Sequence, residues 1–292
     1  MIRASCFFLL MVILSSCEKN IDFKLNEADP VLVVDGQIED GQPPRVILST
    51  SLSYFGAISP QILASSFVHG ANIKISNGTL THQLKEYALP FGGQYIGYYY
   101  SIDSANLPTA FVGEFGKGYS MVINLSGMEY KATTTIPLLT KKVDSLWFKV
   151  APNNPDTNKR VLIAKVTDPP GLGNYIRYFT RRNSGPFLPA LNSVYNDQVV
   201  DGTTYQGQVD PGIDRNDPPK TGENFFFKGD TVTFKLSNID KATYTFWNTW
   251  EFAQQSIGNP FSQPGKVQGN ISNGALGAFC GYANWFGTVI AK

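Results

Sequence analysis

The fold is decided by residues 71–84, which read ANIKISNGTLTHQL. Apolar side chains at Ala71, Ile73 and Ile75 alternate with polar ones, which is the two-residue period of a strand that buries one face. Asn77-Gly78 follows directly, and this dipeptide favours the left-handed dihedral angles of a two-residue hairpin turn. The chain then returns through a second alternating run that ends at Leu84. These residues therefore predict a β-hairpin.

Similar runs extend the β pattern on both sides of this hairpin. Further strands are expected at 31–38, 45–48, 119–125 and 130–134. Short strands joined by tight turns are typical of β-sandwiches. Residues 31–137 are therefore predicted to form a β-sandwich of immunoglobulin-like or prealbumin-like type.

Residues 138–292 are predicted to form a second β-rich domain with one helix near the C-terminus, so the whole chain is assigned to the mainly β class. Asp, Asn, Gly and Pro are dense over 186–229, which predicts a long loop. Asp240 precedes apolar residues at helical spacing, so a helix is expected at about 241–256. Its apolar stripe consists of Ala242, Phe246, Trp250 and Ala253.

The composition narrows the classes of function. Charge is sparse and balanced, with 24 Lys+Arg against 23 Asp+Glu in 292 residues, which argues against a nucleic-acid partner. The sequence contains no nucleophile elbow, zinc-protease motif, phosphate-binding loop or dinucleotide fingerprint. No catalytic residue, cofactor or metal site is therefore assigned. Two carboxylates alone can hydrolyse a glycoside, so a pocket with paired carboxylates would reopen an enzymatic interpretation.

Residues 1–16 are predicted to be a secretory signal peptide, because the apolar run 7–14 is too short to span a membrane. Leu14-Ser15-Ser16-Cys17 resembles the lipobox of bacterial lipoproteins, in which the cysteine thiol accepts diacylglycerol. Cys17 is therefore the predicted lipidation site, and residues 17–30 the lipidated tether. The predicted location is the outer membrane, on its periplasmic or cell-surface face. The alternative is an ordinary secretory signal with a chance cysteine.

The cysteine count leaves no intramolecular disulfide. Cys6 leaves with the signal peptide and Cys17 carries the lipid, so Cys280 has no partner. Cys280 lies in a predicted strand, and a buried, inert thiol is expected there. A catalytic cysteine would need a base, and His69 and His82 both lie in the other half of the chain.

The segment 259–274 is constrained by its prolines and by Asn273-Gly274, and it presents polar side chains in a fixed arrangement. One interpretation is that Asn259 and Asn270 satisfy buried backbone groups between the helix and the last strand. The other is that this segment contacts a ligand or a partner. The candidate contact residues are Asn259, Phe261, Asn270 and Asn273.

The predicted loop 186–229 also concentrates oxygen ligands of the kind that calcium takes. They are Asp197, Asp201, Asp210, Asp214 and Asp217, with Asn216. Their spacing fits no EF-hand loop, so a solvated acidic loop is favoured. Whether the acidic stretch 197–217 binds calcium stays open at this point.

Several motifs together resemble a family of uncharacterised Bacteroidota outer-membrane lipoproteins. They are Cys17-Glu18-Lys19 with Ile21-Asp22, Val34-Asp35-Gly36, Gly70-Ala71-Asn72-Ile73, Tyr130-Lys131-Ala132-Thr133, and the segment 259–279. Gly269 departs from this pattern, in which a serine is expected. The resemblance implies no catalytic residues. The resemblance implies that the gene lies beside that of a TonB-dependent receptor, as is often the case in this family. It also implies that acidic residues near the anchor, here Glu18 and Asp22, favour export to the cell surface.

Three functions follow from these observations. The leading one is a non-enzymatic lipoprotein, anchored in the outer membrane, that is an accessory or ligand-binding partner of a TonB-dependent transporter. Its contacts are expected from 186–229 and 259–274. The second is an independent surface module that binds glycan or protein, and the third is an unrecognised enzyme. The sequence names no ligand.

Replacing Cys17 by alanine is expected to release the protein from membranes into the soluble fraction. The substitution removes the residue that carries the acyl chains, and stable anchoring requires more than one such chain. Fractionation of cells that produce Cys17→Ala measures this release. Membrane association equal to that of the wild type would contradict the lipidation site.

Overall fold

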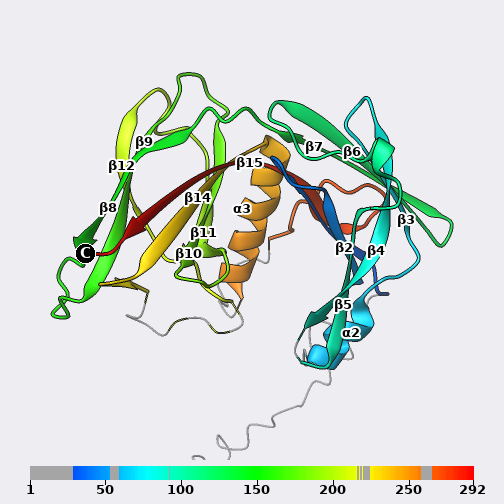
Figure 1. The fold of residues 1–292 in the computed structure, drawn as a ribbon, viewed down its shortest axis with the longest axis horizontal. Coiled ribbons are helices and arrows are strands. Elements are labelled where there is room, and N and C mark those ends of the chain that lie inside the picture. Colours follow the sequence, from blue (N-terminus) through cyan, green and yellow to red (C-terminus); the bar gives the residue numbers. More distant parts are fainter. Residues whose placement is uncertain are drawn as a thin grey trace, which may run out of the picture.

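The computed structural model describes residues 29–52, 59–91, 93–215, 217, 219, 224–257 and 265–292. These residues are mainly β, as predicted, and contain two α-helices, of which the one at 241–256 was predicted (Figure 1). The strands of the first half are β1 (Leu32–Glu39), β2 (Arg45–Thr50), β3 (Asn72–Ser76), β4 (Thr81–Phe91), β5 (Tyr95–Ile102), β6 (Lys117–Leu125) and β7 (Met128–Ile136). Those of the second half are β8 (Lys142–Val150), β9 (Lys159–Thr167), β10 (Tyr175–Arg182), β11 (Leu188–Tyr195), β12 (Thr204–Val209), β13 (Phe226–Phe227), β14 (Thr231–Ile239) and β15 (Leu276–Ile290).

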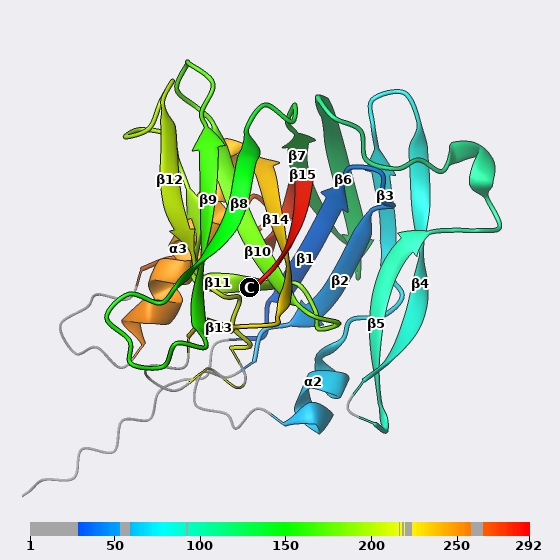
Figure 2. The same cartoon turned by 60° about the vertical axis from the view of Figure 1, so that its left-hand side comes forward.

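One sheet runs through both halves of the chain. Its order is β11-β10-β14-β15-β1-β2-β5-β4-β3-β6-β7, and β15 joins the halves by pairing parallel with β1 and antiparallel with β14. Figure 2 shows β15 and β14 beside β1 and β2 in the middle of the molecule. The predicted hairpin is present as β3 and β4, in which Ser76 pairs with Thr81. The predicted turn is wrong in part: Gly78 has a φ of 89°, but Asn77 does not adopt a positive φ, and its side chain instead accepts from the N–H groups of Thr79 and Leu80.

In the first half, this sheet folds back on itself around a core. β7 lies against β15, and the two strands approach so closely that a Cβ on Gly281 would lie 2.5 Å from the Thr135 carbonyl oxygen. The enclosed cluster contains Ile38, Ile73 and Ile123, all fully buried, together with Phe279 from β15. Alternation along each strand thus places the predicted apolar face inside.

In the second half, a smaller sheet covers the large one. It contains β12, β9 and β13, with β8 paired to β9. Side chains such as Leu162 of β9, Tyr178 of β10 and Leu236 of β14 fill the space between the two sheets. The residues of the two cores therefore separate close to residue 137. The predicted division into domains 31–137 and 138–292 stays a prediction, because β15 pairs both with β1 of the first half and with β14 of the second.

The predicted long loop 186–229 is wrong in part, because β11, β12 and β13 lie within it. These strands are held by partners elsewhere in the chain: β11 by β10, and both β12 and β13 by β9. These strands were not predicted, because Asp, Asn, Gly and Pro residues divide the stretch into apolar runs that are too short to show the two-residue alternation of a strand.

The helix α3 (Lys241–Ser256) begins at Asp240, whose side chain accepts a hydrogen bond from the Thr243 N–H at 2.7 Å. Phe246 is buried as predicted, whereas Ala242 is exposed, so the buried face is rotated relative to the predicted stripe. Glu251 on this face is buried, and its carboxylate accepts hydrogen bonds from the backbone N–H and hydroxyl of Ser193.

A second helix, α2 (Pro60–Ser66), was not expected from the sequence. It has seven residues, too few to display an apolar period, and the Ser59 hydroxyl caps it by accepting from the Ile62 N–H at 3.2 Å. A 3-10 turn, η1, covers Leu107–Thr109. Within the described ranges, the helices are too short or too polar to cross a membrane.

Cys280 is expected to behave as an inert thiol, because it is buried as predicted and burial raises its pKa to about 12. In the folded protein, Cys280 should resist iodoacetamide at about pH 8, a pH at which an exposed thiol with a pKa of ~8.5 reacts. The same protein unfolded in urea provides the positive control and should be labelled. A melting temperature that falls on addition of reductant would contradict the absence of a structural disulfide.

Candidate functional site

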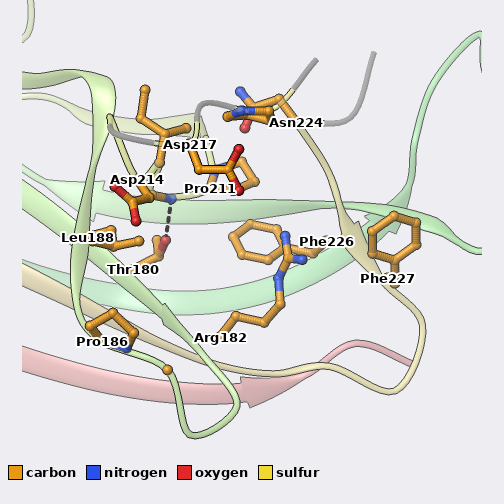
Figure 3. A pocket seen from close by; sticks show the side chains of 14 residues that line it. Thr180, Arg182, Pro186, Leu188, Pro211, Asp214, Asp217, Asn224, Phe226 and Phe227 are labelled. Atoms are coloured by element: carbon orange, nitrogen blue, oxygen red, sulfur yellow. Dashed lines mark hydrogen bonds between the residues drawn. The ribbon is translucent and has the colours of Figure 1, made fainter. Parts of the chain in front are cut away.

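A pocket among the described residues lies at one end of the second half and is formed largely by the stretch 186–229. Its volume is about 510 Å³, and it opens between the β10–β11 turn, the segment after β12, and β13 (Figure 3). Its lining residues include Thr180, Arg182, Leu188, Asp214, Asp217, Asn224, Phe226 and Phe227.

Two backbone contacts hold the wall of the pocket that follows β12. The Gly212 N–H donates to the Thr180 hydroxyl at 2.6 Å, the contact drawn as a dashed line in Figure 3. The Ile213 N–H donates to the Pro189 carbonyl at 3.0 Å. This wall is therefore attached to two paired strands, and the pocket is pre-formed.

The opposite wall carries a positioned guanidinium. Arg182 donates to the Phe225 carbonyl at 2.8 Å and lies 3.4 Å from the Asp230 carboxylate. Its guanidinium carbon also lies 5.7 Å from the Phe226 ring centroid and 5.8 Å from that of Phe227. Phe227 is 37% exposed. The wall thus combines a cation with aromatic faces, which suits a polar ligand that has one apolar side.

Asp214 and Asp217 provide carboxylates to the same pocket. They belong to one turn, in which the Asp217 N–H donates to the Asp214 carbonyl at 3.2 Å. In Figure 3 both lie on the upper side of the pocket, with Arg182 and Phe226 below them. Glycosidases place their two carboxylates on either side of the scissile bond. The pocket therefore holds the paired carboxylates that an enzymatic interpretation would require.

This architecture and pocket occur in a chain whose residues 18–284 match the model of a family described as a domain of unknown function, DUF4249. The chain belongs to the DUF4249 family. A search of curated proteins found no match.

Of the predicted contact residues of this DUF4249 chain, Asn270 and Asn273 are described by the structure, and neither lines the pocket. Asn259 and Phe261 lie outside the described residues, as does Cys17. The Asn270 side chain donates to the carbonyls of Thr133 and Phe279 and accepts from the Phe279 N–H. These are the backbone contacts that the structural interpretation expects, and a partner contact at Asn270 stays a prediction.

Asn273 has a different role. With Gly274 it forms a turn at φ values of 60° and 77°, as the dipeptide predicts. Its side chain donates to the Glu129 carbonyl at 3.3 Å. Asn270 and Asn273 thus both attach the segment before β15 to β7.

The two histidines are engaged in the first half. His82 is fully buried between the Thr109 hydroxyl and the Asp103 N–H, and desolvation lowers its pKa. His69 Nδ1 lies 2.5 Å from the Glu86 carboxylate, which also accepts from the Tyr100 hydroxyl at 2.8 Å. Burial and this carboxylate raise the pKa of Tyr100 to about 12.

The acidic residues of the predicted loop divide into separate groups. Asp214 and Asp217 line the pocket, Asp210 follows β12, and Asn216 lies outside the described residues. Asp197 and Asp201 lie in the connection between β11 and β12. The favoured solvated acidic loop is therefore wrong for Asp197, whose side chain is buried, and the residues that the sequence grouped are separated by β12.

Sequence reasoning missed Thr180, Arg182 and Phe226 as site residues of this DUF4249 chain. Thr180 and Arg182 lie at the end of β10, and their contribution depends on the pairing of β10 with β11. Phe226-Phe227 in a polar stretch was the available signal, because adjacent aromatic residues in a loop are unusual unless they pack or bind.

Asn270→Ala is expected to destabilise the fold by about 2–4 kcal/mol, because it leaves two carbonyls and one N–H without their partner. Urea unfolding of the variant measures this loss. The same substitution at exposed Asn124 of β6 serves as the control and should change stability by less than ~0.5 kcal/mol. Equal stability of both variants would mean that the Asn270 contacts are not structural.

Proposed function

We propose that this chain is a lipoprotein anchored in the outer membrane through Cys17 that acts as a non-enzymatic, ligand-binding accessory of a TonB-dependent transporter. The observation that carries the proposal is the pre-formed pocket of about 510 Å³ lined by Arg182, Phe226, Phe227, Asp214 and Asp217. Its size falls within the range of small-molecule sites.

The anchoring part of the proposal rests on the lipobox. The family match begins at residue 18, directly after Cys17, so the residues before it fall outside the matched domain. The transporter part rests on the resemblance to Bacteroidota lipoproteins encoded beside TonB-dependent receptors. Surface exposure is part of the same proposal.

The lining of the pocket offers groups that bind polar ligands, and its candidate acid–base groups are Asp214 and Asp217. The described residues around it include no histidine or cysteine, and both histidines of the chain have partners in the first half. A tethered protein also gains effective concentration at a membrane receptor, so a weak contact suffices for partnership.

A second candidate is an independent surface module that binds glycan, and it is favoured by one observation. Exposed Phe227 lines the same pocket as two carboxylates and a guanidinium, so the ring can stack on a sugar whose hydroxyls the charged groups hydrogen-bond. In that case a soluble glycan would bind without a barrel protein. Release of reducing sugar that is lost in Asp214→Asn or Asp217→Asn would instead establish hydrolysis and overturn the non-enzymatic assignment.

Cross-linking in intact cells, followed by pull-down in detergent, is expected to recover a TonB-dependent barrel. The complex should weaken little with added salt, because the mature chain is almost neutral overall. Arg182→Ala and Phe227→Ala should each reduce recovery about tenfold, the scale of a residue worth more than ~1 kcal/mol.

Lys149→Ala is the matched control. It removes a comparable cation–aromatic pair, with Lys149 5.9 Å from the Trp147 ring on β8, outside the pocket. Recovery should stay at the wild-type level. Absence of the barrel even after cross-linking would refute the partnership, and equal losses in all three variants would refute the pocket as the contact site.

A further inference from the structure

Three carboxylates from two connections meet at the end of the second half opposite to the pocket. Asp168 directly follows β9, and Asp197 and Asp201 lie between β11 and β12. One oxygen from each carboxylate lies within 4.8 Å of those of the other two. Two ligand oxygens of one calcium ion, each 2.3–2.6 Å from it, are separated by up to about 5 Å. The three oxygens are thus close enough to share one ion.

The charge of this cluster is only partly compensated. Asp168 is 1% exposed, and Lys141 Nζ lies 2.5 Å from its Oδ1. Within the described part of the chain, its buried Oδ2 has no hydrogen-bond partner. One ammonium against three carboxylates leaves two negative charges, and a buried, unpaired carboxylate oxygen is costly.

The other two carboxylates are held in place by backbone groups. The N–H groups of Gly173 and Asn174 both donate to Oδ2 of Asp197 at 2.8 Å. The Gly171 N–H donates to Oδ1 of Asp201 at 2.7 Å. In each of these two aspartates, the backbone N–H groups bind only one of the two carboxylate oxygens. The β9–β10 connection therefore orients both aspartates of the β11–β12 connection, and the cluster is pre-organised.

We propose that Asp168, Asp197 and Asp201 bind a divalent cation, and that the cation is Ca²⁺. All three ligands are hard oxygens, and two uncompensated charges match one divalent ion. Calcium takes six to eight oxygens in flexible geometry, so water completes the shell on the side of Asp201, which is accessible to solvent. Zinc and copper prefer nitrogen or sulfur ligands, and the described cluster has neither.

Bound calcium would fix three segments at once. It would join the β9–β10 connection to the β11–β12 connection. Through Asp168 and Lys141 it would also join both to the segment before β8. That segment is attached to β14, because Asn238 accepts from the Lys141 N–H and donates to the Lys141 carbonyl, both at 2.9 Å. The site would therefore stabilise the place where the chain passes from its first half to its second.

Calorimetric titration of the full mature lipoprotein, freed of metal with EDTA and kept in detergent, tests the proposal. Ca²⁺ should bind with 1:1 stoichiometry and a Kd below about 1 mM, the weak limit of extracellular calcium modules, and should raise the melting temperature. Mg²⁺ at equal concentration should bind at least about tenfold more weakly, because it demands near-ideal octahedral geometry.

Asp201→Asn should weaken Ca²⁺ binding at least tenfold, and its accessible position makes it the variant most compatible with folding. Asp210→Asn is the control, because Asp210 is exposed in the same acidic stretch but outside the cluster. Its affinity should change less than twofold. No heat of binding and no thermal shift at millimolar Ca²⁺ would overturn the proposal, as would equal affinity of Asp201→Asn and wild type.

Discussion

The structure depends on β15, a strand of fifteen residues that has a partner on each side and a packed layer on each face. Its Phe279 and Ala283 enter the core of the first half, and Trp285 and Val289 on the same face border the core of the second. Cys280 and Tyr282 on the opposite face pack under α3. Burial on both faces explains why the middle of β15 is continuously apolar or small, as is typical of strands covered on both sides.

This arrangement makes the first half incomplete without the last residues of the chain. β1 needs β15 as its parallel partner, and a parallel pair requires a long crossover. Asp240 reinforces the same junction, because it caps α3 and also accepts from the Thr135 N–H of β7 at 2.8 Å and from the Thr134 hydroxyl. The two cores therefore support each other although their residues are well separated in sequence.

Local patterns predicted local structure well. The alternation around Asn77-Gly78 indicated β3 and β4, and Asp240 with the apolar stripe indicated α3 at 241–256. What the sequence did not reveal depends on distant partners: β11, β12 and β13 exist through pairing with β10 and β9. The pocket was missed for the same reason, since Arg182 joins Asp214 only after those pairings form. Asn270 shows the converse case. It was predicted as a contact residue for a ligand or partner, and its side chain forms hydrogen bonds with the backbone of Thr133 and Phe279.

The pocket and the acidic cluster lie at opposite ends of the same strands. β10 begins after Asn174, which donates to Asp197, and ends at Arg182 in the pocket. β12 likewise begins after Asp201 and ends before Gly212, which is bound to Thr180. Paired strands transmit position better than flexible loops do, so an ion that fixes one end reduces the freedom of the walls at the other. A ligand that enters such a pocket loses less of its binding free energy to ordering the protein. The pocket and the cluster thus share β10 and β12, and the same strand pairings position the side chains of both.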